Sequence, residues 1–139
     1  MITHVFDTSA VLAHYFNEPG ADEVERIWQD HRNEIGLSAL SVAELRGRLG
    51  ALVSDRDEVE RAMRLYTEEI TTVVAVDRIV AHRAADLRKT ARMRLPLVDA
   101  VVAATAGVSS AILVHRDPHY AALGAATNAP QQLVLPDRL

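Results

Sequence analysis

The chain has 139 residues, of which 49% are hydrophobic, and it contains no cysteine. This length fits one domain with a sizeable core, and the apolar content is not that of a disordered chain. The lack of cysteine excludes a disulfide scaffold, a thiolate metal site and a cysteine nucleophile, and the formal net charge of −4 is unlike that of most nucleic-acid-binding proteins, which are basic.

No segment has the pattern of a membrane span or of a secretory signal. The longest apolar run, residues 100–108, is too short to cross a bilayer. The N-terminus has no basic region and carries an acid as early as Asp7. We therefore expect a cytoplasmic protein that does not enter a membrane.

Short strands and helices alternate through the first half of the chain. Glu18-Pro19-Gly20 separates two of the helices. The expected elements, in chain order, are a strand at 2–6, helices at about 9–16 and 21–32, a weaker strand at 34–37, and helices at about 42–53 and 57–69.

The second half continues the alternation. The β-branched run at 72–76 predicts a strand, and Asp77 is expected to cap a long helix whose apolar side carries Val80, Ala84, Leu87 and Ala91. Pro96 interrupts the helical pattern. A buried helix at 97–106, a strand at 111–114, a short helix at 118–123 and a final strand at 132–135 follow.

Strands separated by helices require crossover connections. The expected fold is therefore α/β, a parallel sheet with helices on both faces. Ligands of such sheets collect beyond the carboxyl ends of the strands, where the strand order reverses. Asp7 and Asp117 each follow a strand, and Glu44 and Asp99 are expected in the first turns of helices that begin near that edge.

Each of the four acids also has a structural explanation. Asp7 could be a turn residue or a helix N-cap, and Asp117, which precedes a proline, could open a turn. Ser41 and Glu44 have the spacing of a capping box. Asp99 would interact well with a helix dipole, but its helix is otherwise apolar, and burying that charge without a partner is costly.

Taken together, the four carboxylates predict a cation site. Their mutual repulsion needs a counter-charge, and hard oxygen ligands at this density favour Mg²⁺ or Mn²⁺. With these four set aside, the remaining 15 of the 19 acids equal the 15 Lys and Arg residues in number. The chain is thus expected to be a metal-dependent enzyme that cuts phosphodiester bonds.

Basic residues gather just before the Asp99 segment. Arg88, Lys89, Arg92 and Arg94 could form a solvated helix face or contact substrate phosphates, and we take Arg88 and Arg92 as substrate candidates. Other catalytic schemes fit less well, because the six histidines lack zinc-site spacing and neither a nucleophile elbow nor a phosphate-binding glycine loop is present.

Four motifs resemble those of PIN-domain ribonucleases. Their order and spacing match over residues 6–120, and the chain length agrees with the VapC toxins of type II toxin–antitoxin modules. The motifs are Asp7-Thr8-Ser9-Ala10-Val11-Leu12, the Ser38–Leu45 stretch with Glu44, the 95–106 stretch with Asp99, and the 113–120 stretch, in which Asp117 is followed by the aromatic Tyr120.

The resemblance implies a single PIN domain over residues 1–139, with five parallel strands in the order 3-2-1-4-5. It also implies an endoribonuclease toxin that forms a homodimer and is silenced by a cognate VapB-type antitoxin, whose tail enters the acidic cleft, often with an arginine. The metal ligands implied, directly or through water, are Asp7, Glu44, Asp99 and Asp117. We assign the primary ion to Asp7 and Asp99.

The expected reaction is attack on RNA by metal-activated water, leaving 5′-phosphate and 3′-hydroxyl ends. Thr8 or Ser9 could bind a carboxylate or a substrate phosphate, or could simply cap the first helix, which we favour. His115 and His119 depart from the family pattern, which commonly has Thr or Ser at the first position and in some members an acid or Asn near the second. Both departures bear on whether a second ion binds.

Three other functions remain open at this point. A phosphoacceptor receiver module fits poorly, because it requires paired acids after the first strand and a late lysine, and Lys89 is the only lysine. A PIN-like fold without catalysis could act as a partner-binding module. An RNA-processing nuclease that is not a toxin would carry the same four acids.

Overall fold

The computed structural model describes residues 1–138 and has one five-stranded parallel sheet in the order β3-β2-β1-β4-β5, as predicted. The strands are β1 (His4–Phe6), β2 (Ile35–Ser38), β3 (Thr72–Val74), β4 (Ile112–His115) and β5 (Gln132–Val134). The helical elements are α1 (Thr8–Tyr15), α2 (Ala21–Gln29), α3 (Ala39–Leu52), α4 (Arg56–Arg64), the π-helix η1 (Leu65–Ile70), α5 (Arg78–Thr90), α6 (Leu97–Val108) and the 3-10 helix η2 (Pro118–Ala125).

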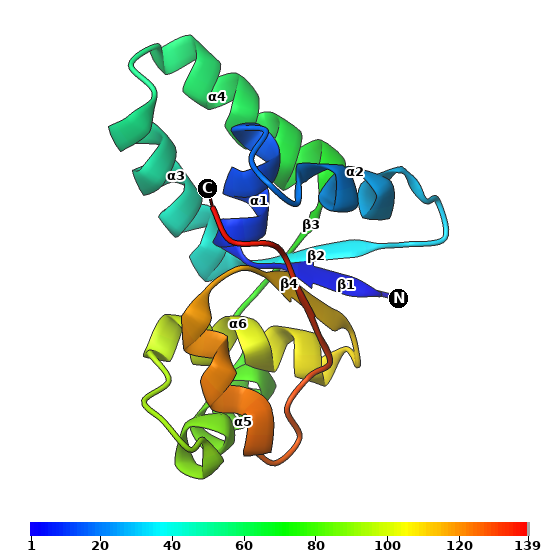
Figure 1. Cartoon of the computed structure of the whole chain (residues 1–139), viewed down its shortest axis with the longest axis vertical. Helices are drawn as coiled ribbons and strands as arrows, with labels where there is room; N and C mark the ends of the chain where they lie inside the picture. The colour runs from blue at the N-terminus through cyan, green and yellow to red at the C-terminus, as the bar shows by residue number, and fades with distance from the viewer. Residues whose placement is uncertain (139) are drawn as a thin grey trace.

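Helices cover both faces of the sheet (Figure 1). Successive side chains of a strand point to opposite faces, so Val5 packs against α5 and α6 while Phe6 packs against α1 and α3. In β4, Leu113 and Val114 divide between the two cores in the same way. The central strands are buried on both faces, as parallel sheets require.

The start of α3 corrects one prediction. The helix begins at Ala39, three residues before the expected position, and its N-cap is Ser38, whose side chain accepts from the Leu40 N–H at 3.2 Å. Ser41 therefore lies inside the helix, and the capping box that was one of the two explanations for Glu44 does not form, because Ser38 is the N-cap. Glu44 lies in the second turn of α3 and not in the first.

The segment after α4 also differs from the prediction. One continuous helix was expected at 57–69, whereas α4 ends at Arg64 and the chain continues as the π-helix η1 to Ile70. Tyr66 and Ile70 of η1 are buried in the core beside α1. The wider winding of η1 carries the chain into β3 at the edge of the sheet.

Two further features of the fold bear on function. Gly20 has a left-handed backbone conformation, φ 97°, which lets the chain turn sharply between α1 and α2. Among residues 1–138, no helix is both long and apolar enough to cross a membrane.

Candidate active site

Asp7 and Asp117 lie at the carboxyl edge of two neighbouring strands. Strands β1 and β4 pair in parallel with Phe6 opposite Val114, and the Asp7 N–H donates to the Val114 carbonyl at 3.0 Å. The connections from these two strands run in opposite directions across the sheet, because β2 lies beside β1 on one side and β5 beside β4 on the other. The two acids therefore sit at the switch point where parallel sheets form ligand sites.

Glu44 and Asp99 reach the same place from helices. Asp99 is the third residue of α6, where the helix dipole favours a negative charge. Glu44 Oε1 accepts a 2.7 Å hydrogen bond from the Thr8 hydroxyl at the start of α1. All four acids line one cleft of about 630 Å³, named the acid cleft below. The structure thus brings together the four carboxylates that the sequence singled out.

The residues after Asp7 hold carboxylates in place. Asp7 is the N-cap of α1, and its Oδ2 accepts from both the N–H and the hydroxyl of Ser9, at 2.9 and 2.5 Å. The favoured prediction that Thr8 or Ser9 merely caps the helix is therefore wrong: Asp7 provides the cap, while the hydroxyl of Thr8 binds Glu44 and that of Ser9 binds Asp7.

Tyr120 is a site residue for which the sequence reading assigned no role. Its buried phenol donates a 2.7 Å hydrogen bond to Asp7 Oδ1. Burial and the neighbouring Asp7 carboxylate raise the pKa of this phenol, so it stays a protonated donor. The one indication in the sequence was the aromatic residue that follows the Asp117 turn.

The electrostatics of the acid cleft centre on Asp99. Its side chain is almost fully buried, and burial together with the negative charges of Asp117, Asp7 and, last, Glu44 raises its pKa from 3.8 to about 7, against the lowering influence of His119. Like charges disfavour one another's ionisation only when they lie close together. The raised pKa therefore reflects the burial of Asp99 first and, after it, the proximity of the other three acids.

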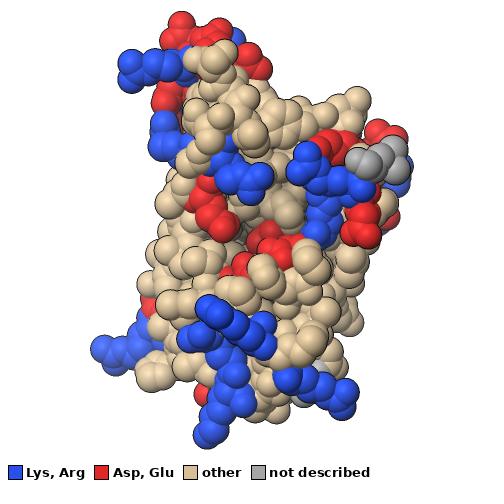
Figure 2. Space-filling view, turned by 60° about the vertical axis from the view of Figure 1, so that its left-hand side comes forward, with Lys and Arg blue, Asp and Glu red and all other residues tan. Residues whose placement is uncertain are grey.

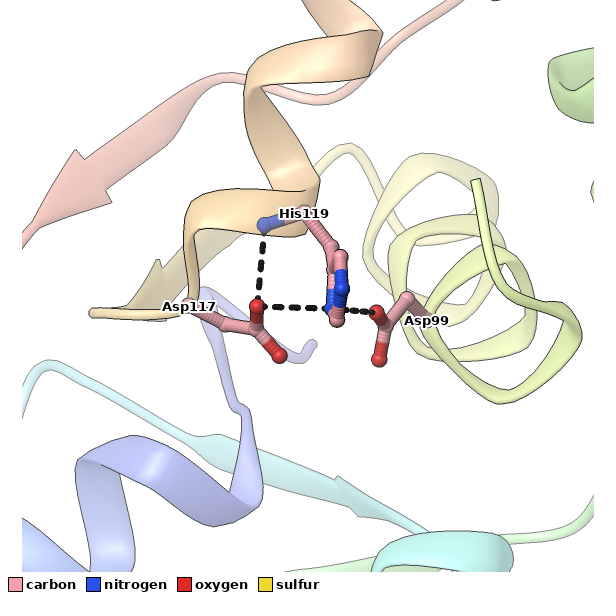
Figure 3. A group of neighbouring side chains, drawn as sticks. All are labelled: Asp99, Asp117 and His119. Atoms are coloured by element: carbon pink, nitrogen blue, oxygen red, sulfur yellow. Dashed lines mark hydrogen bonds and ion pairs between the residues drawn. The ribbon is translucent and has the colours of Figure 1, made fainter. Parts of the chain in front are cut away.

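Asp99, Asp117 and His119 offer ligand atoms that lie within 4.8 Å of one another. Asp99 Oδ2 is buried and accepts no hydrogen bond within the described residues, which is costly for a carboxylate unless a cation is nearby. The donor set consists of carboxylate oxygens and one imidazole nitrogen (Figure 3). These residues fit a divalent cation, because their ligand atoms are of the right kind and because the buried oxygen of Asp99 has no hydrogen-bond donor that would stabilise its charge.

The walls of the acid cleft are apolar and basic. Leu12, Phe16 and Leu52 form an apolar side, and Phe16 and Leu52 are exposed. The basic residues lining the cleft are Arg48, Arg116 and Arg138. Figure 2 shows acidic side chains gathered in a hollow on this face, with basic side chains on both sides of it.

The two arginines predicted to meet substrate lie elsewhere. Arg88 donates through Nε to the Leu95 carbonyl at 3.0 Å and so braces the loop between α5 and α6. Arg92 is exposed in the same loop. Neither is among the described residues that line the acid cleft.

Arg116 is tied to the site and to a second arginine. Its N–H donates to the Ser9 hydroxyl at 3.0 Å, and its guanidinium pairs with Glu18. The other oxygen of Glu18 lies 3.1 Å from Nε of Arg138. Glu18 therefore holds two arginines at the edge of the acid cleft, a pairing that the sequence did not indicate.

Comparison with known proteins agrees with this architecture. No curated protein matches the sequence. Among solved structures, VapBC2 from Rickettsia felis, bound to a DNA fragment from its promoter, superposes with a TM-score of 0.74 at 13% identity, covering 97% of this chain and 100% of that one. FitAcB from Neisseria gonorrhoeae gives 0.68 at 24% identity, covering 89% and 95%.

A third similar structure is VapC20 from Mycobacterium tuberculosis, described as a Sarcin-Ricin loop cleaving toxin, with a TM-score of 0.68, 17% identity and coverage of 92% and 100%. At these identities the structural likeness establishes the fold alone. The PIN domain family model, however, matches residues 4–126, most of the sequence. This chain belongs to the PIN domain family.

Proposed function

We propose that this protein is a divalent-cation-dependent endoribonuclease and the toxin of a type II toxin–antitoxin module. The observation that carries the proposal is the convergence of Asp7, Glu44, Asp99 and Asp117, from four separate segments, on one cleft. The raised pKa of Asp99 supports it, because strongly perturbed carboxyls in clefts mark functional sites. Membership of the PIN family supports nuclease chemistry.

The four carboxylates would hold Mg²⁺ or Mn²⁺. Such an ion, when bound, supplies a Lewis acid and lowers the pKa of a water molecule at the scissile phosphate. Asp7 is fixed for this task by Ser9 and Tyr120, which occupy both of its oxygens from the protein side. Asp99 has a free oxygen and is our assignment for the primary ligand together with Asp7.

Glu44 and Asp117 have different surroundings. Glu44 is exposed at the mouth of the cleft and is oriented by Thr8, so it can accept a proton from an attacking water or hold a second ion. Asp117 Oδ1 accepts from the His119 N–H at 2.9 Å, which fixes its carboxylate toward Asp99. RNA would cross the cleft between the exposed Arg48 and Arg138, since guanidinium groups suit phosphate contacts.

The antitoxin and dimer assignments extend the same proposal. An inhibitory tail with apolar side chains and an arginine would match the apolar wall at Phe16 and Leu52 and the acids beside it. Co-expression with the product of an adjacent small reading frame should relieve toxicity. A homodimer would have twice the 15.2 kDa mass of the chain, measurable by light scattering. The proposed activity places the protein in the cytoplasm, where its RNA substrate is.

Growth arrest and RNA cleavage test the proposal together. Expression should arrest growth, and the purified protein should cleave RNA with Mg²⁺ or Mn²⁺ and stop on chelation. Asp99→Asn and Asp7→Asn should abolish both effects, while Asp86→Asn, a matched change on the exposed face of α5, should abolish neither.

The alternative functions give different outcomes in the same experiment. Cleavage without growth arrest would identify an RNA-processing nuclease that is not a toxin. Growth arrest that persists in Asp99→Asn, without cleavage by either protein, would identify a partner-binding module without catalysis.

A further inference from the structure

The imidazole of His119 lies between two carboxylates of the acid cleft. Its Nδ1 is 3.1 Å from Asp99 Oδ2 and 3.0 Å from Asp117 Oδ1. Both are ion-pair distances, and Asp99 Oδ2 accepts no hydrogen bond from any described residue. Figure 3 shows the ring reaching from η2 toward α6, with both carboxylates turned to it.

The backbone fixes these three side chains in relation to one another. Asp117 is the N-cap of η2, and its Oδ1 accepts from the His119 N–H, so the cap and the histidine belong to one turn. Asp99 is held by the first turn of α6, among buried neighbours. The backbones that carry all three residues are therefore fixed, and the exposed His119 ring is oriented by its contacts with the two carboxylates.

Asp99 offers the least engaged carboxylate oxygen of the acid cleft. Asp7 Oδ2 accepts two hydrogen bonds from Ser9, whereas Asp7 Oδ1 accepts one from Tyr120 and keeps a lone pair for an ion, and Glu44 Oε1 accepts one from Thr8. Among the described residues, Asp99 Oδ2 is the buried carboxylate oxygen that lacks a hydrogen bond. Two oxygens and a nitrogen within 4.8 Å of one another form one face of a coordination shell.

His115, a second histidine near the acid cleft, uses both of its ring nitrogens in hydrogen bonds. His115 Nδ1 accepts from the Asp117 N–H at 3.1 Å, and its Nε2 is bonded to the Gln132 side chain at 2.8 Å. With both ring nitrogens used, His115 supports the strand ends and Asp117. His119 is left as the nitrogen donor that faces the carboxylates.

We propose that His119 Nδ1 is a metal ligand together with Asp99 and Asp117, and that it makes the site prefer Mn²⁺ over Mg²⁺. This inference rests on the proposed function and narrows its cofactor. Mg²⁺ takes oxygen ligands almost exclusively, whereas imidazole nitrogen favours first-row transition ions. A mixed nitrogen and oxygen site therefore discriminates against Mg²⁺ more than four carboxylates alone would.

The test measures metal binding without catalysis. Free Mn²⁺ is followed by electron paramagnetic resonance during titration of the purified protein, and Mg²⁺ is measured by competition. The proteins compared are the wild type, His119→Asn, His119→Asp and, as the matched control, His82→Asn on the exposed face of α5. His119 is itself exposed, so its substitutions should leave the fold intact, which circular dichroism verifies.

His119→Asn should weaken Mn²⁺ binding about tenfold or more, as expected for the loss of a ligand, and should change Mg²⁺ binding much less. His119→Asp provides an oxygen ligand in place of the imidazole nitrogen, so the Mn²⁺ and Mg²⁺ affinities of this variant should be closer to each other. Pulsed resonance of bound Mn²⁺ should show coupling to an imidazole nitrogen in the wild type and in His82→Asn, and none in His119→Asn.

Two other outcomes overturn the inference in distinguishable ways. If the wild type binds Mn²⁺ but His119→Asn keeps the same Mn²⁺ affinity and the same nitrogen coupling, His119 is not a ligand and the proposed nuclease function is untouched. If the wild type binds neither ion, the cation-dependent function fails together with the role of His119.

Discussion

The phenol of Tyr120 donates its hydrogen bond to Asp7 Oδ1 across 113 positions of sequence. This bond joins η2 to the end of β1 and leaves Asp7 with both oxygens held, one by Tyr120 and the other by Ser9. A carboxylate held from two sides is fixed in orientation before a ligand arrives. Preorganisation of this kind lowers the reorganisation needed during a reaction.

Tyr120→Phe should therefore impair catalysis more than folding. Losing the hydrogen bond should cost about 1 kcal/mol of unfolding free energy and reduce the single-turnover cleavage rate about tenfold, as loss of support around a metal ligand typically does. Tyr15→Phe, which removes an exposed hydrogen bond to Glu58, is the control and should keep full activity. Equal cleavage rates for both variants would show that Tyr120 does not position Asp7.

Asp99 makes the metal-free protein sensitive to pH. Its pKa is raised from 3.8 to about 7 in the fold, so the folded state holds this proton over a range in which the unfolded state has lost it. Stability then falls as the pH rises through that interval. Above about pH 7 Asp99 is ionised in the folded protein, and its buried charge then lowers the free energy of unfolding by its full amount.

Asp99→Asn should remove this dependence of the free energy of unfolding on pH. Stability is measured by urea unfolding with a chelator present. Above the Asp99 pKa the variant should be more stable than the wild type by roughly 1–2 kcal/mol, a figure reduced because water in the cleft screens the charges. Below pH 4 the two proteins should be about equally stable. Added Mn²⁺ should stabilise the wild type strongly and the variant little. Parallel stability curves for the two proteins at all pH values would refute the electrostatic account of Asp99.

Glu18 should be important for stability because it balances a buried charge. The Arg116 side chain is 8% exposed and that of Glu18 20%, and Arg116 Nη1 has no hydrogen-bond partner within residues 1–138. Glu18→Gln should destabilise the protein by about 2–3 kcal/mol, since it leaves the guanidinium without its counter-charge. Glu60→Gln breaks the exposed pair with Arg46 and should change the free energy of unfolding very little, because water screens that pair. Similar small losses of unfolding free energy in the two variants would mean that water solvates the Arg116 guanidinium when Glu18 is replaced.

Replacement of Ser38 and of Ser41 by alanine should have opposite effects on the stability of the protein. Ser38 caps α3, so Ser38→Ala should cost about 1 kcal/mol. Ser41 is fully buried and its hydroxyl has no partner among the described residues, so Ser41→Ala should be neutral or stabilising. Thermal unfolding measures both. A larger loss for Ser41→Ala than for Ser38→Ala would show that the Ser41 hydroxyl contributes to stability and that the account of the α3 start is wrong.

That pair of serines shows where sequence reasoning succeeded and where it failed. Periodicity and β-branched runs predicted every strand and the helices on both faces, because these patterns follow directly from which side chains are buried. The start of α3 was misplaced because Ser41 and Glu44 match a local signature. The structure uses Ser38 instead, the last residue of β2, which serves as both strand end and helix cap.

The acid cleft shows the same division. Asp7 and Asp117 could be placed from topology, because parallel strands bring their carboxyl ends to one edge. The Tyr120 hydrogen bond and the Glu18–Arg116 pair could not, because each joins residues about a hundred positions apart through side-chain geometry. The hydrogen bond from Arg88 to the Leu95 carbonyl could not be predicted either, because charge alone does not reveal which partner a guanidinium contacts.

The chemical ends left on cleaved RNA test the central claim most directly. Attack by a cation-activated water on the phosphodiester predicts 5′-phosphate and 3′-hydroxyl ends, formed by the wild type with Mn²⁺ or Mg²⁺ and absent with chelator or with Asp99→Asn. End-labelling and mass spectrometry of the products distinguish the possibilities. Ends carrying a 2′,3′-cyclic phosphate, or cleavage that continues in chelator, would contradict an acid cleft that works through a bound divalent cation.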